Sequence, residues 1–256
     1  MNVPYSTPSE AFYLELGIIP IGVIIEARRI NYLHYILTRK ENEMLYTFFK
    51  TQWHNETPGD WTVQIKLDLE DLGIPCNFEY IKSKSINSFK KLVKAKAKQY
   101  ALNLLIEKQK KHSKMKNLSY TELAMQEYFK IEGISTKQAQ NVFKWRVRMA
   151  PLGENFRGNE KLKMCPLCLS HPDNQTMIFK CESLKNRMKM ECEFEDLYSN
   201  NITLKTAITI TKIEELRENI MKENKNTRNI VMLPGGPSAQ CFTVYSVSAA
   251  KTASLS

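Results

Sequence analysis

The sequence lacks the carboxylate pattern on which metal-dependent phosphoryl transfer relies. Aspartates are few in this chain of 256 residues, and they are Asp60, Asp68, Asp71, Asp173 and Asp196. No two of them are adjacent or spaced to converge on a pair of metal ions, as two-metal catalysis requires. A glycine-rich phosphate loop is also missing, since Gly235 and Gly236 stand between prolines and predict only a turn. We therefore expect no catalytic residue and no enzyme activity from this chain alone.

A secretion signal and a long apolar run are missing as well. The first residues do not form a basic segment followed by an apolar one, which a signal peptide requires. The longest apolar stretch, residues 16–25, is about half of a membrane span and is interrupted by Gly17, Pro20 and Gly22. The 6 cysteines, three of them clustered, favour reduced thiols over a disulfide framework. We therefore expect an intracellular protein, cytoplasmic or nuclear, that is not secreted and does not bind a membrane.

Positive charge is in excess and is concentrated in one segment. The chain has 37 lysines and arginines against 27 aspartates and glutamates. Twelve of the lysines lie between Lys82 and Lys116, where Glu107 is the one acid, so this segment carries the whole excess. A concentrated basic segment is typical of proteins that bind a polyanion, and RNA or DNA is the first candidate. The alternative is a solvated helix face that keeps the protein soluble.

An amphipathic helix is predicted to begin near Ser85, inside the basic segment. Its apolar residues share one face, and the opposite face carries a row of lysines, which are Lys90, Lys91, Lys94, Lys98 and Lys108. Such a division leaves one face for packing and a row of ammonium groups for phosphates. We therefore predict that these five lysines bind nucleic acid.

A second basic helix is predicted from about Thr136 to Met149. Trp145 lies on its apolar stripe, which favours a place in the core over stacking on a base. The other side is polar, and a guanidinium fork matches phosphate oxygens well. We add four cations to the predicted phosphate-binding set, and they are Lys137, Lys144, Arg148 and Arg157.

The hydrophobic periodicity predicts a mainly α-helical chain. At least five helices are expected between residues 18 and 224, and any strands should be short and near the cysteines. The helix after Pro20 has apolar residues off its main face, such as Ile25 and Tyr32, so we expect it to be covered on more than one side. Residues 202–211 are rich enough in β-branched side chains to form a strand instead of the start of the last helix.

Composition divides the chain into five predicted parts. They are an N-terminal segment (1–17), a helical connector with the basic helix (18–158), a Cys-rich knuckle-like module (159–200), a terminal amphipathic segment (201–224) and a disordered tail (225–256). The tail has no acidic residue and no hydrophobic period, which is typical of a segment without a packed core.

Cys165 and Cys168 have the spacing of a zinc knuckle. Two thiolates from one tight turn reach the same tetrahedral ion, and Cys181 would be the third ligand. The fourth is either His171 or Cys192, and we favour His171 because a compact loop loses less chain entropy on closing. A zinc ion bound here would be structural. The alternative is that the cysteines pack as reduced, weakly polar side chains without a metal.

The order of several short motifs resembles one known family. Residues 13–21 and 27–39 are similar to the segment downstream of the polymerase domain in non-LTR (LINE-type) retrotransposon reverse transcriptases of animals. The similarity continues through Gly59-Asp-Trp61, the lysine-rich helix, residues 146–149 and 155–157, and Cys165-Pro-Leu-Cys168 to Cys181. It spans roughly residues 10–222, and the collinear order of the motifs carries more weight than any one of them.

The resemblance implies a helical connector followed by a Cys-Cys-His-Cys knuckle that helps to hold template RNA or target DNA. The family is an RNA-directed DNA polymerase, but its catalytic aspartates lie upstream, in a palm that this chain does not contain. Carried over by position, Cys165, Cys168 and Cys181 match the cysteines of the family, whereas Met177 stands where the family has its histidine. The resemblance therefore also implies a degenerate metal site.

Two functions remain as expectations. The first is a nucleic-acid-binding C-terminal fragment of a retrotransposon reverse transcriptase that lacks the polymerase centre. The second is a helical scaffold, or a host-adopted interaction protein, whose basic face binds an acidic protein partner. Both use the same lysines, and they differ in the ligand and in how strongly salt weakens its binding.

Overall fold

The computed structural model describes residues 6–55, 57–155, 163–199 and 202–230, with side chains as far as residue 223. Within these ranges the chain is mainly α-helical and contains no strand. Two isolated antiparallel bridges are present, Leu16 with Met125 and Met164 with Pro172. The predicted fold class is therefore confirmed, since the helices dominate and one of the bridges lies beside the cysteines.

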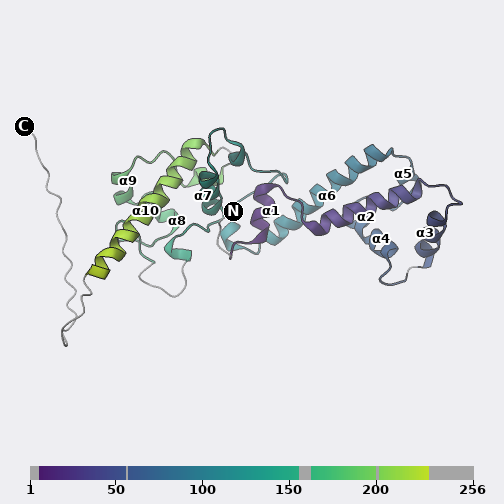
Figure 1. The fold of residues 1–256 in the computed structure, drawn as a ribbon, viewed down its shortest axis with the longest axis horizontal. Coiled ribbons are helices and arrows are strands. Elements are labelled where there is room, and N and C mark those ends of the chain that lie inside the picture. Colours follow the sequence, from purple (N-terminus) through teal and green to yellow (C-terminus); the bar gives the residue numbers. More distant parts are fainter. Residues whose placement is uncertain (1–5, 56, 156–162, 200–201, 231–256) are drawn as a thin grey trace, which may run out of the picture.

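The molecule is elongated, and two long helices form its axis (Figure 1). Helix α2 (Ile21–Leu37) and helix α6 (Ile86–Gln109) run side by side in opposite directions. Helices α3 (Met44–Asn55), α4 (Trp61–Asp71) and α5 (Phe78–Lys82) gather at one end of this pair. Helix α1 (Ser9–Leu16) packs against α6 near the middle of the molecule.

The other end of the molecule holds the Cys-rich module. Helix α7 (Thr136–Arg146) packs against the long α10 (Leu204–Ile230), and the short helices α8 (Gln175–Lys180) and α9 (Glu182–Arg187) lie beside them (Figure 1). Short 3-10 turns at Ser113–Met115, Glu127–Lys130, Gly153–Asn155 and Glu195–Tyr198 occur in the connecting segments.

Several helix ends follow from their capping residues. The Ser85 hydroxyl accepts a hydrogen bond from the Ser88 amide at the start of α6. Ser135 and Gln138 form a complete capping box at the start of α7. Helix α1 ends at Gly17, whose φ of 65° is left-handed, and a Cβ there would lie 2.4 Å from the Ala124 carbonyl carbon. The end of α1 is therefore fixed by a close backbone approach as well as by a cap.

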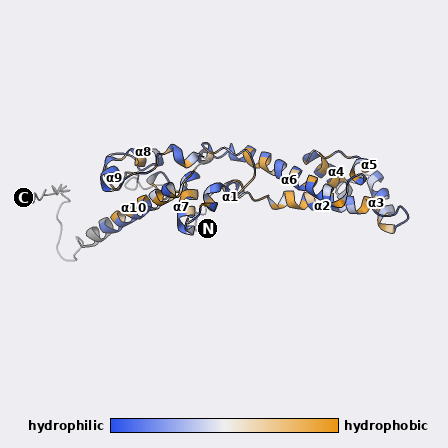
Figure 2. Cartoon of the chain, turned by 90° about the horizontal axis from the view of Figure 1, so that it is seen from above, coloured by the Kyte–Doolittle hydropathy of each residue, from blue (hydrophilic) through white to orange (hydrophobic). Residues whose placement is uncertain are grey.

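The first core contains the buried apolar side chains of α1–α6, with parts of the 115–128 segment and of α7. Helix α6 is the central helix of this core. The buried residues recur at every fourth position, as Phe89, Val93, Ala97, Ala101, Leu105 and Gln109. Because four residues exceed one turn by about 40°, this buried stripe winds by roughly 200° along the helix. The polar and apolar residues that alternate along α6 are visible in Figure 2.

The second core is smaller and contains Trp145, Leu152, Cys165, Ile178 and Leu184, with Cys181, Ala150, Leu197, Ile210 and Ile213. Residues 204–211 are helical, and the strand alternative for 202–211 is not observed. A helix places Ile210 and Ile213 on the same side, where both are fully buried in this core. Burial on a helical period thus outweighs the β propensity of the segment.

Three expectations differ in detail from the structure. Residues 9–16 form α1, and Ala11 and Leu14 are buried in the first core together with α6. Helix α10 continues to Ile230, beyond residue 224, and residues 231–256 of the predicted tail lie outside the described residues. Helix α2 packs against both α6 and α4, as expected, but Ile25 and Tyr32 are 44% and 47% exposed, so the described residues do not cover these two positions.

Candidate metal centre and basic face

The turn that contains Cys165 and Cys168 folds back on itself. The Leu169 amide donates to the Cys165 carbonyl at 2.9 Å, and Leu169 takes a left-handed φ of 56°. The Cys165 amide then donates to the His171 carbonyl at 2.9 Å, next to the bridge between Met164 and Pro172. The backbone of His171 is restricted because this residue precedes Pro172. His171 therefore takes part in closing the loop, and the closed loop brings it back to the cysteines.

Cys181 reaches the same point from the junction of two short helices. It ends α8 and caps α9, and its side chain is buried. Its sulfur lies 4.0 Å from that of Cys165. The ligand atoms of Cys165, Cys168, His171 and Cys181 all lie within 4.8 Å of one another. A tetrahedral ion with metal–sulfur bonds of about 2.3 Å holds its sulfurs roughly 3.8 Å apart, so the four residues fit one metal ion.

The surroundings of the sulfurs favour the thiolate form at Cys168 but not at Cys165. Burial alone would raise the pKa of Cys168, but the Ser170 hydroxyl and amide and the His171 amide donate to its sulfur and lower the pKa to about 6. Burial raises the pKa of Cys165 to about 12, although the Leu167 and Cys168 amides oppose this shift. A positive ion would offset the burial cost, because a metal-bound thiol loses its proton.

One ring nitrogen of His171 has no hydrogen-bond partner among the described residues. Its Nδ1 lies 3.2 Å from the Pro172 carbonyl oxygen, and its Nε2 is buried without a hydrogen-bond partner among the described residues. A buried polar atom without a partner costs about 1–3 kcal/mol, so an orphan nitrogen beside three sulfurs is itself evidence for a ligand. The residues present therefore fit a metal ion.

Neither Cys192, the other candidate for the fourth ligand, nor Met177 joins the cluster. Cys192 is buried against α10, where burial and the Asp196 carboxylate raise its pKa to about 11 and the Thr209 hydroxyl opposes the shift. Met177 lies in the first turn of α8, half-buried, and its amide donates to the Asn174 side chain at 2.9 Å. His171 completes the set of four without either of them.

The lysine row of α6 is present on its first half. Lys90, Lys91 and Lys94 are exposed and Lys98 is half-buried, and none of them forms an ion pair with a residue that the structure describes. Lys90, Lys94 and Lys98 each follow a residue of the buried stripe directly, so they form one row beside it. Lys108 is exposed but precedes Gln109, which puts it on the opposite flank of the winding stripe.

The predicted cations of the second basic helix are engaged within the chain. Lys137 bonds to the Glu215 carboxylate at 2.7 Å, which raises its pKa, and Arg148 bonds to Glu154 at 2.9 Å. Burial raises the pKa of the Glu214 carboxyl, and the charge of the half-buried Lys144 opposes this shift. Arg157 lies outside the described residues. Lys137, Lys144 and Arg148 therefore do not extend the lysine row as a free surface.

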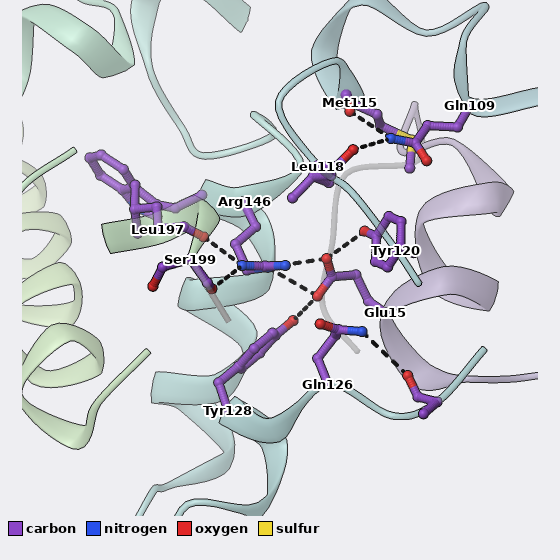
Figure 3. Close-up of polar contacts among 12 residues, drawn as sticks. Glu15, Gln109, Met115, Leu118, Tyr120, Gln126, Tyr128, Arg146, Leu197 and Ser199 are labelled. Carbon is purple, nitrogen blue, oxygen red and sulfur yellow. Dashed lines mark hydrogen bonds and ion pairs between the residues drawn. The ribbon is translucent and has the colours of Figure 1, made fainter. Parts of the chain in front are cut away.

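A buried polar network that the sequence did not predict joins α1 to α7 (Figure 3). The Arg146 Nε donates to both Glu15 oxygens at 3.1 and 3.2 Å, and the Tyr120 and Tyr128 hydroxyls donate to the same oxygens at 2.6 and 2.8 Å. Arg146 also donates to the Leu197 carbonyl at 2.6 Å. Glu15 and Arg146 are almost fully buried, so the network holds the two cores together.

A second buried pair supports the metal cluster. Arg217 of α10 forms two parallel hydrogen bonds of 2.7 Å with Asp173, and the Gly153 amide donates to Asp173 at 2.6 Å. Asp173 stands two residues after His171, so this bidentate pair anchors the ligand loop to α10. The pairing of Arg217 with Asp173 is difficult to predict from the sequence, because the two partners are 44 residues apart.

Comparisons with protein-family models, with curated proteins and with solved structures give no match to this chain. No helix within the described residues is both long and apolar enough to cross a membrane. The site therefore has to be interpreted from its own geometry.

Proposed function

We propose that this chain is a nucleic-acid-binding fragment of a non-LTR retrotransposon reverse transcriptase, without the polymerase centre. The lysine row of α6 binds phosphates, and a structural zinc ion shapes the Cys-rich module. The retrotransposon origin rests on the sequence resemblance alone. The binding function rests on the placement of charge.

The lysine row carries the proposal. Lys90, Lys94 and Lys98 line one flank of α6 and Lys91 lies beside them, with no carboxylate paired to them among the described residues. Elsewhere many cations pair with acids, as Lys110 does with Glu107. A protein that needed these charges for stability would pair them, whereas unpaired ammonium groups gain most by releasing the counterions of a polyanion.

The ion that fits the cluster best is zinc. Three sulfurs and one imidazole nitrogen form a soft donor set, which suits zinc and excludes calcium and magnesium. All four protein ligands are used, so no position remains open for a catalytic water. The ion would therefore hold the loop, α8 and α9 together, and His171 would replace the histidine that the family has at Met177.

The test is the salt dependence of RNA and DNA binding by the purified zinc-loaded chain. We expect the triple variant Lys91→Glu/Lys94→Glu/Lys98→Glu to bind every sequence more weakly. The log–log salt slope should become shallower by about 0.7 for each phosphate of a single strand that the variant no longer neutralises. The matched control reverses Lys189, Lys205 and Lys212, which are also exposed, and should have little effect.

Equal binding by the parent and the α6 triple variant at low salt would contradict the proposal. The alternative, an acidic protein partner, predicts a different result. In that case nucleic acid would bind weakly, and one acidic protein would bind saturably and lose affinity in the α6 variant alone.

A further inference from the structure

Helix α2 exposes a regular stripe that the first core does not use. Ile21, Ile25, Arg28, Tyr32 and Tyr35 are all exposed, at alternating spacings of four and three residues. This spacing places them on one side of a helix. The buried residues of α2, such as Ile30, Leu33 and Leu37, lie on its other side, toward α4 and α6. The stripe is thus an apolar and aromatic surface open to solvent.

Its aromatic end is an ordered row of flat groups. The Tyr32 and Tyr35 rings are nearly parallel, at 16°, with their centroids 5.9 Å apart. The Arg39 guanidinium lies 4.1 Å from the centre of the Tyr35 ring, and the Trp61 ring lies 6.0 Å from that of Tyr32. The Trp61 indole is fixed by a 2.6 Å hydrogen bond to Gln52. The tyrosines nevertheless remain 47% and 40% exposed.

This row lies at the same level of the helix pair as the first lysines of α6. His34 of α2 stacks on Phe89 of α6 with ring centroids 4.7 Å apart. Tyr32 and Tyr35 flank His34 in the sequence, and Lys90 and Lys91 directly follow Phe89. The two tyrosines and the first two lysines are therefore within two residues of one contact between α2 and α6.

We propose that Tyr32 and Tyr35 form a stacking site for unpaired bases, so that the ligand of the lysine row is single-stranded nucleic acid. This deepens the proposed function and rests on it. Exposed aromatic rings beside a row of cations are the combination with which proteins hold single strands, because every base has a π face. Bases in a duplex already stack on each other and cannot reach such rings.

A second copy of the chain fits this stripe less well. Arg28 belongs to the stripe and Arg39 covers its end, whereas no carboxylate belongs to it. Two copies facing each other would bring like charges together, which is unfavourable. A strand of nucleic acid offers the opposite charge and flat apolar groups at once.

The experiment compares two variants of the zinc-loaded full chain on two ligands of equal length, a single strand and a duplex. The single strand contains 2-aminopurine, whose fluorescence falls when the base stacks. We expect Tyr32→Ala/Tyr35→Ala to weaken single-strand binding by about tenfold and to abolish the quenching. The salt slope should not change, because the lysines still neutralise the same phosphates, and duplex binding should stay at the parent level.

Two controls separate stacking from folding. Tyr32→Phe/Tyr35→Phe keeps both rings and should retain binding and quenching. Phe48→Ala removes a solitary aromatic side chain that is 58% exposed on α3 and should have no effect. Thermal unfolding of all variants checks that the fold is retained.

The outcomes are distinguishable. If the alanine variant binds and quenches like the parent while the α6 triple variant binds weakly, the stacking site is wrong and the proposed function stands. If neither variant weakens binding, both are wrong. If the parent is a dimer that the alanine variant dissociates, the stripe is an interface between copies and the stacking site is wrong.

Discussion

The first and second cores differ in where they place most of their cations. Around the first core, the lysines of α6 have no ion-pair partner among the described residues, whereas Arg29 of α2 donates to both oxygens of the buried Asp68 of α4. Around the second core, cations are turned inward, and Arg146 and Arg217 are each 2% exposed against buried carboxylates. The difference shows that the location of a charge, rather than its number, separates a binding surface from a structural tie.

The contrast follows from the size of the two cores. The second core is smaller, and apart from α7 and α10 it is built on short helices and loops, so it buries less apolar surface than the first core. Buried ion pairs and side-chain hydrogen bonds add to this packing, and a metal ion held by the Cys-rich cluster would add further stability. The first core has six helices and can leave the lysines of α6 free.

Removing zinc should give the largest effect and should act on the second core alone. A thousandfold excess of free zinc over its Kd adds about 4 kcal/mol to the free energy of unfolding. Chelation should therefore raise amide hydrogen exchange across residues 163–199, while α2 and α6 keep their protection. Equal loss of protection in both cores would contradict the proposed division.

The ligand set can be tested one residue at a time. His171→Ala should abolish stoichiometric zinc binding, whereas Cys192→Ala and Cys76→Ser should not. Met177→His should give no gain in zinc affinity, because His171 already completes the tetrahedron. A tenfold gain in affinity at position 177 would instead restore the interpretation of a degenerate site.

Glu15→Gln should have the next largest effect, because it breaks the tie between the two cores. It leaves Arg146 buried without a countercharge, which costs about 3–5 kcal/mol. Urea unfolding measures the loss. The control is Glu127→Gln at the exposed pair with Lys130, where we expect a change below about 1 kcal/mol. Similar losses in both variants would show that Glu15 and Arg146 are not a buried tie.

Gly17→Ala tests the backbone approach that seats α1 on the first core. The new Cβ would meet the Ala124 and Met125 backbone at 2.4 Å, in a left-handed conformation. We expect a loss of roughly 1–3 kcal/mol in thermal or urea unfolding. Gly22→Ala on α2 meets nothing within 4 Å and should be neutral or gain up to about 1 kcal/mol. A larger loss of stability in Gly22→Ala than in Gly17→Ala would mean that the backbone at Gly17 is not the strained position.

Glu214 offers the smallest effect and a pH signature for the second core. Burial raises its pKa, although the Trp145 indole and the charges of Lys144, Arg217 and Lys137 oppose the shift. The folded state therefore holds this proton to higher pH than the unfolded state does. The stability that this group adds is present below its unfolded pKa and is lost as pH rises through its folded pKa.

Replacing Glu214 by Gln should therefore remove the loss of stability at rising pH while keeping the hydrogen bond from Trp145. We expect a gain below about 1 kcal/mol at pH 7 that shrinks toward pH 4. Urea unfolding at several pH values measures it. A gain that is constant with pH would mean that the titration of Glu214 is not coupled to folding.

The sequence predicts features whose partners are close along the chain. The helix after Ser85, the capping box at Ser135 and the turn between Cys165 and Cys168 all depend on residues within a few positions. His171 could be favoured over Cys192 for the same reason, since loop closure is a local quantity. The mainly α fold could be predicted because a helical period repeats within each segment.

Contacts between distant residues could not be predicted in this way. Glu15 and Arg146 are 131 residues apart, and nothing local marks either as buried. Lys137 and Arg148 match the pattern of phosphate ligands, but carboxylates from α10 and from Glu154 neutralise them. The apolar residues Ile25 and Tyr32 led to the prediction of a covered face, but both are exposed. Periodicity shows which residues are apolar, and it does not show which neighbour covers them.

The winding stripe of α6 has a consequence for how this chain can change in length during evolution. Each added residue turns a helix by about 100°, so one insertion near Lys98 would rotate the half that holds α2 against the half that holds α1. Every buried residue beyond the insertion would then face water. The loop at residues 39–43 has no such phase to keep, and it can gain or lose residues while the lysines, the tyrosines and the cysteines stay in register.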